Sequence, residues 1–366
     1  MTRLIYCYPS AFDDPAVRAY PGVARFSHVA KIYGYWVMPL DRTGTITTPI
    51  RNVSLFPMPK SRPFVKSYED ICNDRAIEIL GNAEKLGISI NVLYSGGIDS
   101  TCLLVSLLKH VTPEQKNNII VLLSHESIAE NPRFYDEHIK GKLRVESSVS
   151  FANFIGQNDM LLSAEHNDLV MGNASVGSMI TRYGPTVLHQ PYSRDLIADF
   201  FAASLGGDLG TANFYFDIFE RLAKTAPVPI RTNFDFMWWY NFATKWQACF
   251  CYILFFTPPR NAHGVTKEYI ETRFVSFYNT DEFQLWSMNN LDKRIKDTWK
   301  SYKWIMKDII YDYTKDAEYR DNKTKVRSLP IVLKQQHMHH RFLDENMRFS
   351  DDLVPEAYVE PTNDFA

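Results

Sequence analysis

The stretch NVLYSGGIDST, residues 91–101, determines the fold that we expect for this chain. Residues 88–93 form a short apolar run with β-branched side chains, which predicts a buried strand. Beyond the stretch, leucines recur with helical spacing as far as Lys109 and His110, and cations are favoured in the last turn of a helix. The sequence therefore predicts a strand, a tight turn over residues 95–100 and a helix.

The turn, SGGIDS, has the composition of a phosphate-binding loop. Paired glycines allow positive φ angles and a close approach of the backbone to a ligand. Successive N–H groups at a helix N-terminus form a cradle for anionic oxygens, and the two serines add donors. Asp99 can hold a divalent cation beside a phosphate. An ordinary strand–turn–helix corner is the alternative, but this combination of residues favours phosphate binding.

The SGGIDS turn resembles the SGGxDS loop of the ATP pyrophosphatases (PP-loop enzymes), which cleave ATP between its α and β phosphates. No GxxxxGK[ST] sequence is present, so the loop is not of the Walker type. The resemblance implies an α/β fold with a parallel sheet of the adenine nucleotide alpha-hydrolase-like type, and ATP and Mg²⁺ as ligands. It implies ATP contacts at the ends of two strands and in the loop: Leu93, Ser95, Gly96, Gly97, Ile98, Asp99, Ser100, Leu123 and Ser124.

A second segment, residues 161–173, follows another short apolar run and contains two acids. It resembles the SGEGxDExxGG segment of asparagine and β-lactam synthetases. The resemblance places Ser163 and Ala164 beside an acyl-adenylate. It gives Glu165 the position of the acid that helps the attacking amine lose its proton, and Asp168 the position of the second Mg²⁺ ligand.

This second segment also departs from the family pattern. Ala164 and His166 stand where the family has glycines, and Leu169 stands where it has an acid. These differences leave the identity of the acyl substrate open. A loop with two solvated acids is the alternative interpretation.

A third segment, residues 299–310, has apolar residues at helical spacing, which predicts an amphipathic helix. Lys303 and Lys307 lie one turn apart on it and should project together. The spacing resembles the KxxLR helix of asparagine synthetases, with Lys307 in place of the arginine. The resemblance implies that Lys303 stabilises the pentavalent phosphorus and the departing pyrophosphate, so Lys303 should matter for rate and little for stability. The alternative interpretation is that both lysines are solvated on a surface helix. Further along the chain, Lys323, Lys325 and Arg327 resemble the basic exit segment of the same family.

The rest of the chain suggests three parts. Residues 1–66 have strand composition, notably at 30–38, and predict a small strand-rich N-terminal domain. Residues 67–330 carry the three motifs and form the expected synthetase-like domain, including a large helical region in which the aromatic segment 234–247 predicts a buried helix. Residues 331–366 predict a loosely ordered tail. Within this tail, residues 337–340 (HMHH) are an unfavoured candidate for metal binding.

Composition narrows the class of protein further. The chain has 366 residues and a formal net charge of −2, so the total charge gives no indication of nucleic-acid binding. Five cysteines occur without a CxxC pair, which gives no support for a zinc site. No signal peptide or membrane-spanning run is visible, so a soluble, cytoplasmic protein with no membrane partner is expected. The sequence leaves the oligomeric state open.

Together these features predict an ATP-dependent ligase of asparagine-synthetase type. Such an enzyme adenylates a small carboxylate, releases pyrophosphate and transfers the acyl group to ammonia or an amine. Thr2 stands where a glutaminase would need cysteine and residues 1–66 are too short for that domain, so a separate ammonia source is expected. Two alternatives remain: a PP-loop enzyme that adenylates a nucleobase or tRNA base, and a non-catalytic nucleotide-binding module.

Overall fold

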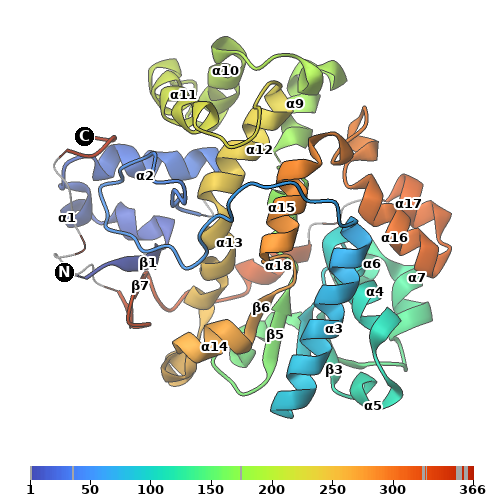
Figure 1. Cartoon of the computed structure of the whole chain (residues 1–366). Helices are drawn as coiled ribbons and strands as arrows, with labels where there is room; N and C mark the ends of the chain where they lie inside the picture. The colour runs from blue at the N-terminus through green and yellow to red at the C-terminus, as the bar shows by residue number, and fades with distance from the viewer. Residues whose placement is uncertain are drawn as a thin grey trace. The chain divides into compact units, whose positions relative to one another are not determined.

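The computed structural model describes residues 2–34, 37–173, 175–323, 326, 328–351, 357 and 362–366 (Figure 1). The chain divides by its internal contacts into two units. The first unit combines Met1–Arg62, Asp168–Phe255 and His340–Ala366, and the second combines Pro63–Asn167 with Phe256–His339. The boundaries predicted at residues 66 and 330 differ from this division, since the two ends of the chain fall in one unit.

The second unit contains a five-stranded parallel sheet, as expected for an α/β protein. Its strands, in the order β4-β3-β2-β5-β6, are Arg144–Ser147, Ile119–Leu123, Ile90–Leu93, Met160–Ser163 and Phe274–Ser276. The chain runs from the central strand β2 outward through β3 to β4, and then returns to the other side of β2 with β5. The order therefore reverses between β2 and β5. In open parallel sheets, ligands bind beyond the carboxyl ends of the strands at such a point.

The predicted strand–turn–helix is present around β2. Helix α4 (Ile98–His110) begins directly after the turn and ends with Lys109 and His110, as the charge pattern predicts. Before β2, α3 (Tyr68–Leu86) is capped by Ser67, whose hydroxyl accepts the Asp70 N–H at 3.1 Å, and it ends at Gly87, which has a φ of 65°. Helix α3 packs against α4, and both pack against α16 (Trp304–Thr314; Figure 1).

Shorter elements complete the second unit. Strand β4 is an edge strand, and the charged side chains of Arg144 and Glu146 suit a strand with one free side. The helices of this unit not yet given are α5 (Pro113–Lys116), α6 (His125–Glu130), α7 (Pro132–Phe134), α14 (Lys267–Thr272), α15 (Asp281–Asn289), α17 (Ala317–Asn322) and α18 (Ser328–Lys334).

The first unit is mainly helical, which corrects the expected strand-rich N-terminal domain. Among the described residues of 2–66, strand is confined to β1 (Leu4–Cys7), which pairs antiparallel with β7 (Phe342–Asp344). The strand expected at 30–38 is wrong at its start, where α2 (Val23–Ile32) ends. The apolar side chains of α2 repeat with helical spacing from Val23 onward and outweigh the local strand composition. Tyr35 and Trp36 lie outside the described residues.

The core of the first unit is α12 (Asn233–Thr244), and every residue of α12 is buried. This confirms that the aromatic segment is a core helix. Gln247, in the following α13 (Trp246–Cys251), uses its amide to bond the backbone of Ile5, Val53 and Leu55. The other helices of the unit are α1 (Pro15–Arg18), α8 (Asn167–Met171, which starts at the last residue of the second unit), α9 (Val176–Tyr183), α10 (Arg194–Ser204) and α11 (Leu209–Lys224).

The C-terminal segment is more ordered than its composition suggests. In its described part, β7 pairs with β8 (Phe349–Ser350), and Phe365 is buried. The predicted loose tail is therefore wrong for these residues, because apolar side chains at both ends of the chain pack together. No group of three or more metal-binding side chains occurs in the part of the chain that the structure describes, and residues 337–340 are included in that part.

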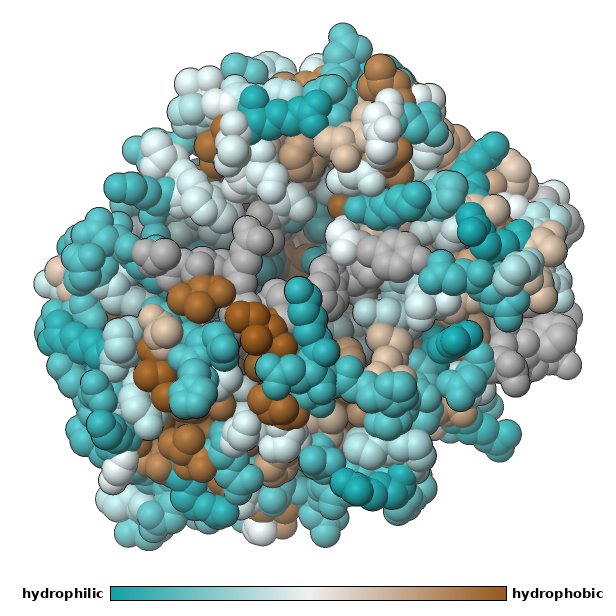
Figure 2. Space-filling view, turned by 180° about the vertical axis from the view of Figure 1, so that it is seen from behind, coloured by the Kyte–Doolittle hydropathy of each residue, from teal (hydrophilic) through white to brown (hydrophobic). Residues whose placement is uncertain are grey.

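The surface offers few other landmarks. Polar side chains cover most of the face seen in Figure 2, with apolar side chains gathered in one part of it. Among the described residues, no helix is long and apolar enough to cross a membrane. All five cysteines are buried and free of disulfides.

Candidate functional site

The turn after β2 requires glycine at one of its two glycine positions. Gly96 has a φ of 74°, and a Cβ atom at this position would lie 2.2 Å from the backbone oxygen of Ser127. Gly97 has a φ of −73°, so the expectation of positive φ holds for Gly96 alone. The chain passes so close to α6 at Gly96 that no side chain fits there.

The two serines of the turn brace it from within. The Ser100 hydroxyl accepts the Ser95 N–H at 3.1 Å and lies 3.0 Å from the Ser95 hydroxyl. The Gly97 N–H donates to the Ser95 hydroxyl at 3.2 Å. The first-turn N–H groups of α4 lack intrahelical acceptors, as at any helix start, and remain as donors for an anion.

The strand ends named for ATP contacts lie beside this turn. Leu93 ends β2 and Leu123 ends β3, the neighbouring parallel strand. Ser124 follows as the cap of α6, and its hydroxyl accepts the Ser127 N–H at 3.3 Å. The carboxyl ends of β2 and β3 therefore meet at the same edge of the sheet as the Ser95 turn.

Asp99 is the centre of a polar cluster. The ammonium of Lys303 donates to both oxygens of Asp99, at 2.7 and 2.6 Å. The Asn167 amide also donates to Asp99, at 2.5 Å, and its oxygen accepts the Tyr68 hydroxyl at 2.5 Å. The Lys303 side chain is 5% exposed and that of Asp99 is 26% exposed, so this ion pair is largely removed from water.

The helix predicted over 299–310 is interrupted at Lys303. Residues Trp299–Ser301 form a 3-10 turn, and α16 begins only at Trp304. Lys303 has a φ of 59°, a left-handed conformation that costs a lysine roughly 1–2 kcal/mol. Its N–H donates to the carbonyl of Arg294 at 3.0 Å. The left-handed turn lets the chain carry the Lys303 side chain to Asp99 before the helix starts.

Lys307 does not share the role expected for it beside Lys303. Its ammonium donates to the carbonyl of Lys300 at 2.5 Å. Burial lowers the pKa of Lys307 below the ordinary lysine value, and the charge of Lys323 lowers this pKa further. The structure thus separates two lysines that the spacing groups together.

The second motif begins at the end of β5, next to β2. The Ser163 carbonyl accepts the Phe277 N–H at 2.9 Å, and half-exposed Ala164 and Glu165 follow. His166 is fully buried, with its Nδ1 2.7 Å from the hydroxyl of Ser276. A histidine where the sequence resemblance predicts a glycine is thus accommodated by the neighbouring strand β6.

The two acids named for Mg²⁺ fall in different units. Asp168 is half-buried in the first turn of α8 and is grouped with the first unit, whereas Asp99 belongs to the second. Asn167, which precedes Asp168, is the residue of this motif that reaches Asp99. Nothing in the residue type of Asn167 distinguishes it in the sequence from an ordinary helix-starting asparagine.

Two tyrosines hold the backbone of the turn, and sequence reasoning missed both. The Tyr278 hydroxyl donates to the Asp99 carbonyl and the Tyr319 hydroxyl to the Gly96 carbonyl, each at 2.9 Å. Burial raises the pKa of both hydroxyls well above the usual tyrosine range, so they stay protonated as donors. They come from segments about 180 and 220 residues further along the chain, with no local signal to mark them.

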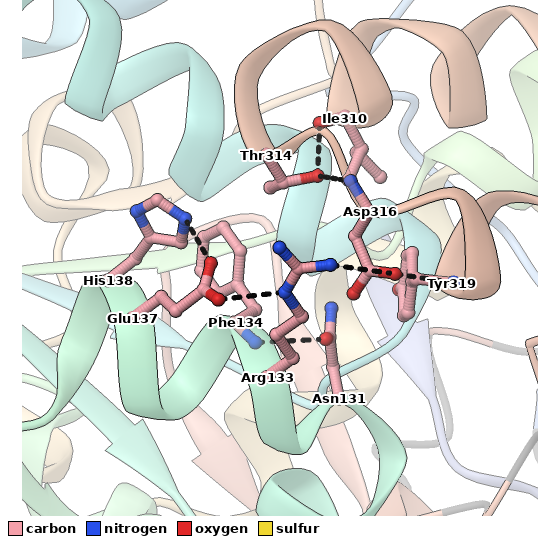
Figure 3. A pocket seen from close by; sticks show the side chains of 9 residues that line it. All are labelled: Asn131, Arg133, Phe134, Glu137, His138, Ile310, Thr314, Asp316 and Tyr319. Carbon is pink, nitrogen blue, oxygen red and sulfur yellow. Dashed lines mark hydrogen bonds and ion pairs between the residues drawn. The ribbon is translucent and has the colours of Figure 1, made fainter.

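Tyr319 also lines a small pocket, together with residues from 131–138 and from the end of α16 (Figure 3). There the Arg133 guanidinium points between Glu137, at 2.8 Å, and Asp316, at 3.6 Å. The Asp316 carboxylate accepts the Tyr319 N–H at 3.0 Å. These contacts fix the start of α17 and thereby the position of Tyr319.

A second buried ion pair lies against the glycines. Glu130 and Lys323 are 2.5 Å apart, and both side chains are less than a tenth exposed. A Cβ at Gly97 would lie 3.4 Å from the Glu130 carboxylate. Of the basic exit segment, Lys323 is therefore near the turn, while Lys325 and Arg327 lie outside the described residues.

Asp99 fits the oxygen chemistry of Mg²⁺ only in part. A carboxylate is a preferred ligand for this ion. Lys303 and Asn167, however, already direct three hydrogen bonds to the two oxygens, of about four that a carboxylate can accept. Lys303 therefore competes with a cation for Asp99.

Comparison with known proteins adds no relative to this picture. No family model, no curated protein and no solved structure matches the chain. What can be said about its function thus comes from the sequence motifs and the geometry above.

Proposed function

We propose that the chain is an ATP-dependent ligase that adenylates a small carboxylate, releases pyrophosphate and passes the acyl group to ammonia or an amine. One observation carries the proposal. The SGGIDS turn lies at the carboxyl end of β2, where the strand order reverses, and Lys303 reaches its Asp99 from far along the chain. This is the place at which open parallel sheets bind nucleotides.

The residues of the turn would hold the phosphates. The first-turn N–H groups of α4 present donors to anionic oxygens. Gly96 keeps the backbone close to α6, and Tyr278 and Tyr319 fix two carbonyls so that the N–H groups point away from them. Donors positioned in advance lose little entropy when the ligand binds, which favours an ordered triphosphate.

Lys303 and Glu165 are proposed for the chemical steps. ATP with Mg²⁺ would supply the electrophilic phosphorus, and Asp99 is the proposed ligand of the ion in this unit. Negative charge grows on the phosphorus oxygens as a carboxylate attacks, and the ammonium of Lys303 would stabilise that charge. Glu165, half-exposed beyond β5, would take a proton from the attacking amine.

The pair between Lys303 and Asp99 adds a condition to this mechanism. The ammonium can serve a phosphate only if it weakens its bonds to the carboxylate. Both partners lie in a poorly solvated site, where an unpaired charge is costly. Phosphate and cation must therefore arrive together, the first for Lys303 and the second for Asp99.

A non-catalytic nucleotide-binding module is the second candidate, and the same ion pair favours it. A carboxylate that a buried lysine already neutralises attracts Mg²⁺ less strongly. Such a module would bind ATP and ADP through the turn, with little dependence on Mg²⁺.

Exchange between ATP and labelled pyrophosphate separates the two candidates. The whole chain is incubated with Mg²⁺, ATP and labelled pyrophosphate across a panel of small carboxylates. A ligase of this kind incorporates label into ATP with its own carboxylate, and Asp99→Asn abolishes the incorporation. Nucleotide binding without exchange on any carboxylate, and without formation of AMP, would leave only the binding module.

A further inference from the structure

A groove beside the start of α16 is not used by the proposed mechanism. It encloses about 350 Å³, and it is formed by the segment before α16, the first turns of that helix and α17. The residues that line it are Lys296, Asp297, Thr298, Lys300, Ser301, Trp304, Lys307, Asp308, Arg320 and Asp321. We refer to it as the lysine groove.

The lysine groove is lined by four basic and three acidic side chains, and three of the basic ones are lysines without a carboxylate partner among the described residues. In the part of the chain that the structure describes, Lys296, Lys300 and Lys307 have no ion pair with a carboxylate. The guanidinium of Arg320 is taken by Asp321, at 2.7 and 3.0 Å.

The two other acids of the groove form no ion pair with these lysines among the described residues. The Asp297 carboxylate accepts the Thr298 N–H at 2.6 Å, and Asp308 is exposed. Lys307 is half-buried, and the charges of Asp321 and Asp308 only partly offset the lowering of its pKa by burial.

An aromatic side chain lines the groove as well. Lys296 lies over the Trp304 ring, 4.0 Å from its centroid. The buried indole N–H of Trp304 has no acceptor among the described residues. Three lysine ammonium groups in one hollow, without carboxylate partners among the described residues, suit an anion with several oxygens.

The lysine groove is electrostatically connected to the SGGIDS turn. The ammonium groups of Lys303 and Lys323 both act on Lys307 and lower its pKa. Lys303 is bonded to Asp99, and Lys323 is paired with Glu130 beside Gly97. Lys307 therefore lies within electrostatic range of one lysine that contacts the turn and of another that is paired beside it.

We propose that the lysine groove binds inorganic pyrophosphate and receives it when it leaves the SGGIDS turn. The proposal rests on the function proposed above, in which pyrophosphate is the first product. The volume is at the lower end for ligand pockets, which suits a small ion better than a whole nucleotide. The chain's net charge of −2 gives no support for an extended polyanion such as a nucleic acid.

Calorimetric titration with magnesium pyrophosphate tests this, with α,β-methylene-ATP as a second ligand that cannot be cleaved. The test protein is Lys296→Gln/Lys300→Gln, because neither side chain contacts the turn. The matched control is Lys293→Gln/Lys315→Gln, which removes two exposed charges from the same unit outside the groove. The test variant should bind pyrophosphate about tenfold more weakly, while the ATP analogue should lose less than about twofold. The control should match wild type for both ligands.

Each failure has its own signature. Equal losses for pyrophosphate and the ATP analogue would mean that the lysines belong to one shared nucleotide site, and unchanged pyrophosphate binding would mean that the groove does not hold it. Either result overturns the inference. If the groove variant alone loses pyrophosphate but the wild-type chain never forms AMP from ATP, the groove stands and the proposed function fails.

Discussion

The turn after β2 and the turn before α16 supply the two charges of one ion pair, but they are built differently. Residues 95–100 are shaped by their own serines and by the close approach of Gly96 to α6, and two distant tyrosines then bond to their backbone carbonyls. Lys303 sits in a left-handed conformation without being a glycine, and its partner Asp99 is 204 residues away. The residue types that the first turn requires are thus visible in its own sequence, whereas the second turn shows no such signal and depends on the finished fold.

The largest effect is expected at Gly96, where the local turn should break. Gly96→Ala would place a methyl group 2.2 Å from the Ser127 oxygen at a φ of 74°. The free energy of unfolding should fall by about 3 kcal/mol, and nucleotide binding should be lost. Urea unfolding and ATP titration measure both.

Two alanine variants serve as controls for Gly96. Gly97→Ala, at a φ of −73°, has milder contacts and should cost less than about 1 kcal/mol. Gly87→Ala has a φ of 65° and no atom near its Cβ, so it isolates the backbone strain at about 1 kcal/mol. Equal losses at positions 96 and 87 would contradict the close approach to Ser127.

The next effect concerns the second turn. Lys303→Met leaves Asp99 with Asn167 as its charge-neutral partner, so stability should fall by about 3 kcal/mol and catalytic rate by a factor of hundreds. This revises the expectation from sequence alone, that stability is nearly preserved. In an Asp99→Asn background the same substitution should cost at least about 1 kcal/mol less, which a double-mutant cycle measures. If the stability losses of the two single variants simply add in the double variant, Lys303 and Asp99 are not energetically coupled.

The tyrosines that hold the first turn should have intermediate effects. Tyr319→Phe and Tyr278→Phe each remove one buried hydrogen bond to a carbonyl, at a cost of about 1–2 kcal/mol. The KM for ATP should rise more than kcat falls, since the turn is misplaced while the reacting groups remain. Tyr313→Phe, on α16, is the control. A kcat effect without a KM effect would contradict a positioning role.

Lys307→Met should have the smallest effect. Because burial lowers the pKa of Lys307, the folded chain binds this proton less well than the unfolded chain. At pH values below the lowered pKa, the charge of Lys307 therefore reduces the stability of the folded chain. This reduction disappears as the pH rises toward the ordinary lysine pKa of about 10.4. At neutral pH the variant should be equal to or slightly more stable than wild type, within about 0.5 kcal/mol. Thermal melts should show that the stability difference between Lys307→Met and wild type is smaller at pH 10 than at pH 7. A loss of stability as large as that of Lys303→Met would contradict this prediction.

Sequence reasoning succeeded where the structure is local. The spacing of apolar residues and the residue types of the turn predict β2, the turn and α4. The continuous aromatic run predicts α12. Sequence reasoning failed where long-range packing determines the local structure, as in the pairing of β1 with β7 and the break before α16. The groups around Asp99 from Asn167 and Tyr278 could not be predicted, because their roles depend on which segments meet in the folded chain.

The reaction products test the central claim most directly. Phosphorus NMR on a mixture of the chain, ATP, Mg²⁺, ammonium and a pool of small carboxylates distinguishes the two bonds that can break in the triphosphate. Cleavage after the α phosphate, expected here, gives AMP and pyrophosphate in equal amounts, and both vanish with Asp99→Asn. ADP and orthophosphate as the main products would contradict the assignment of the SGGIDS turn.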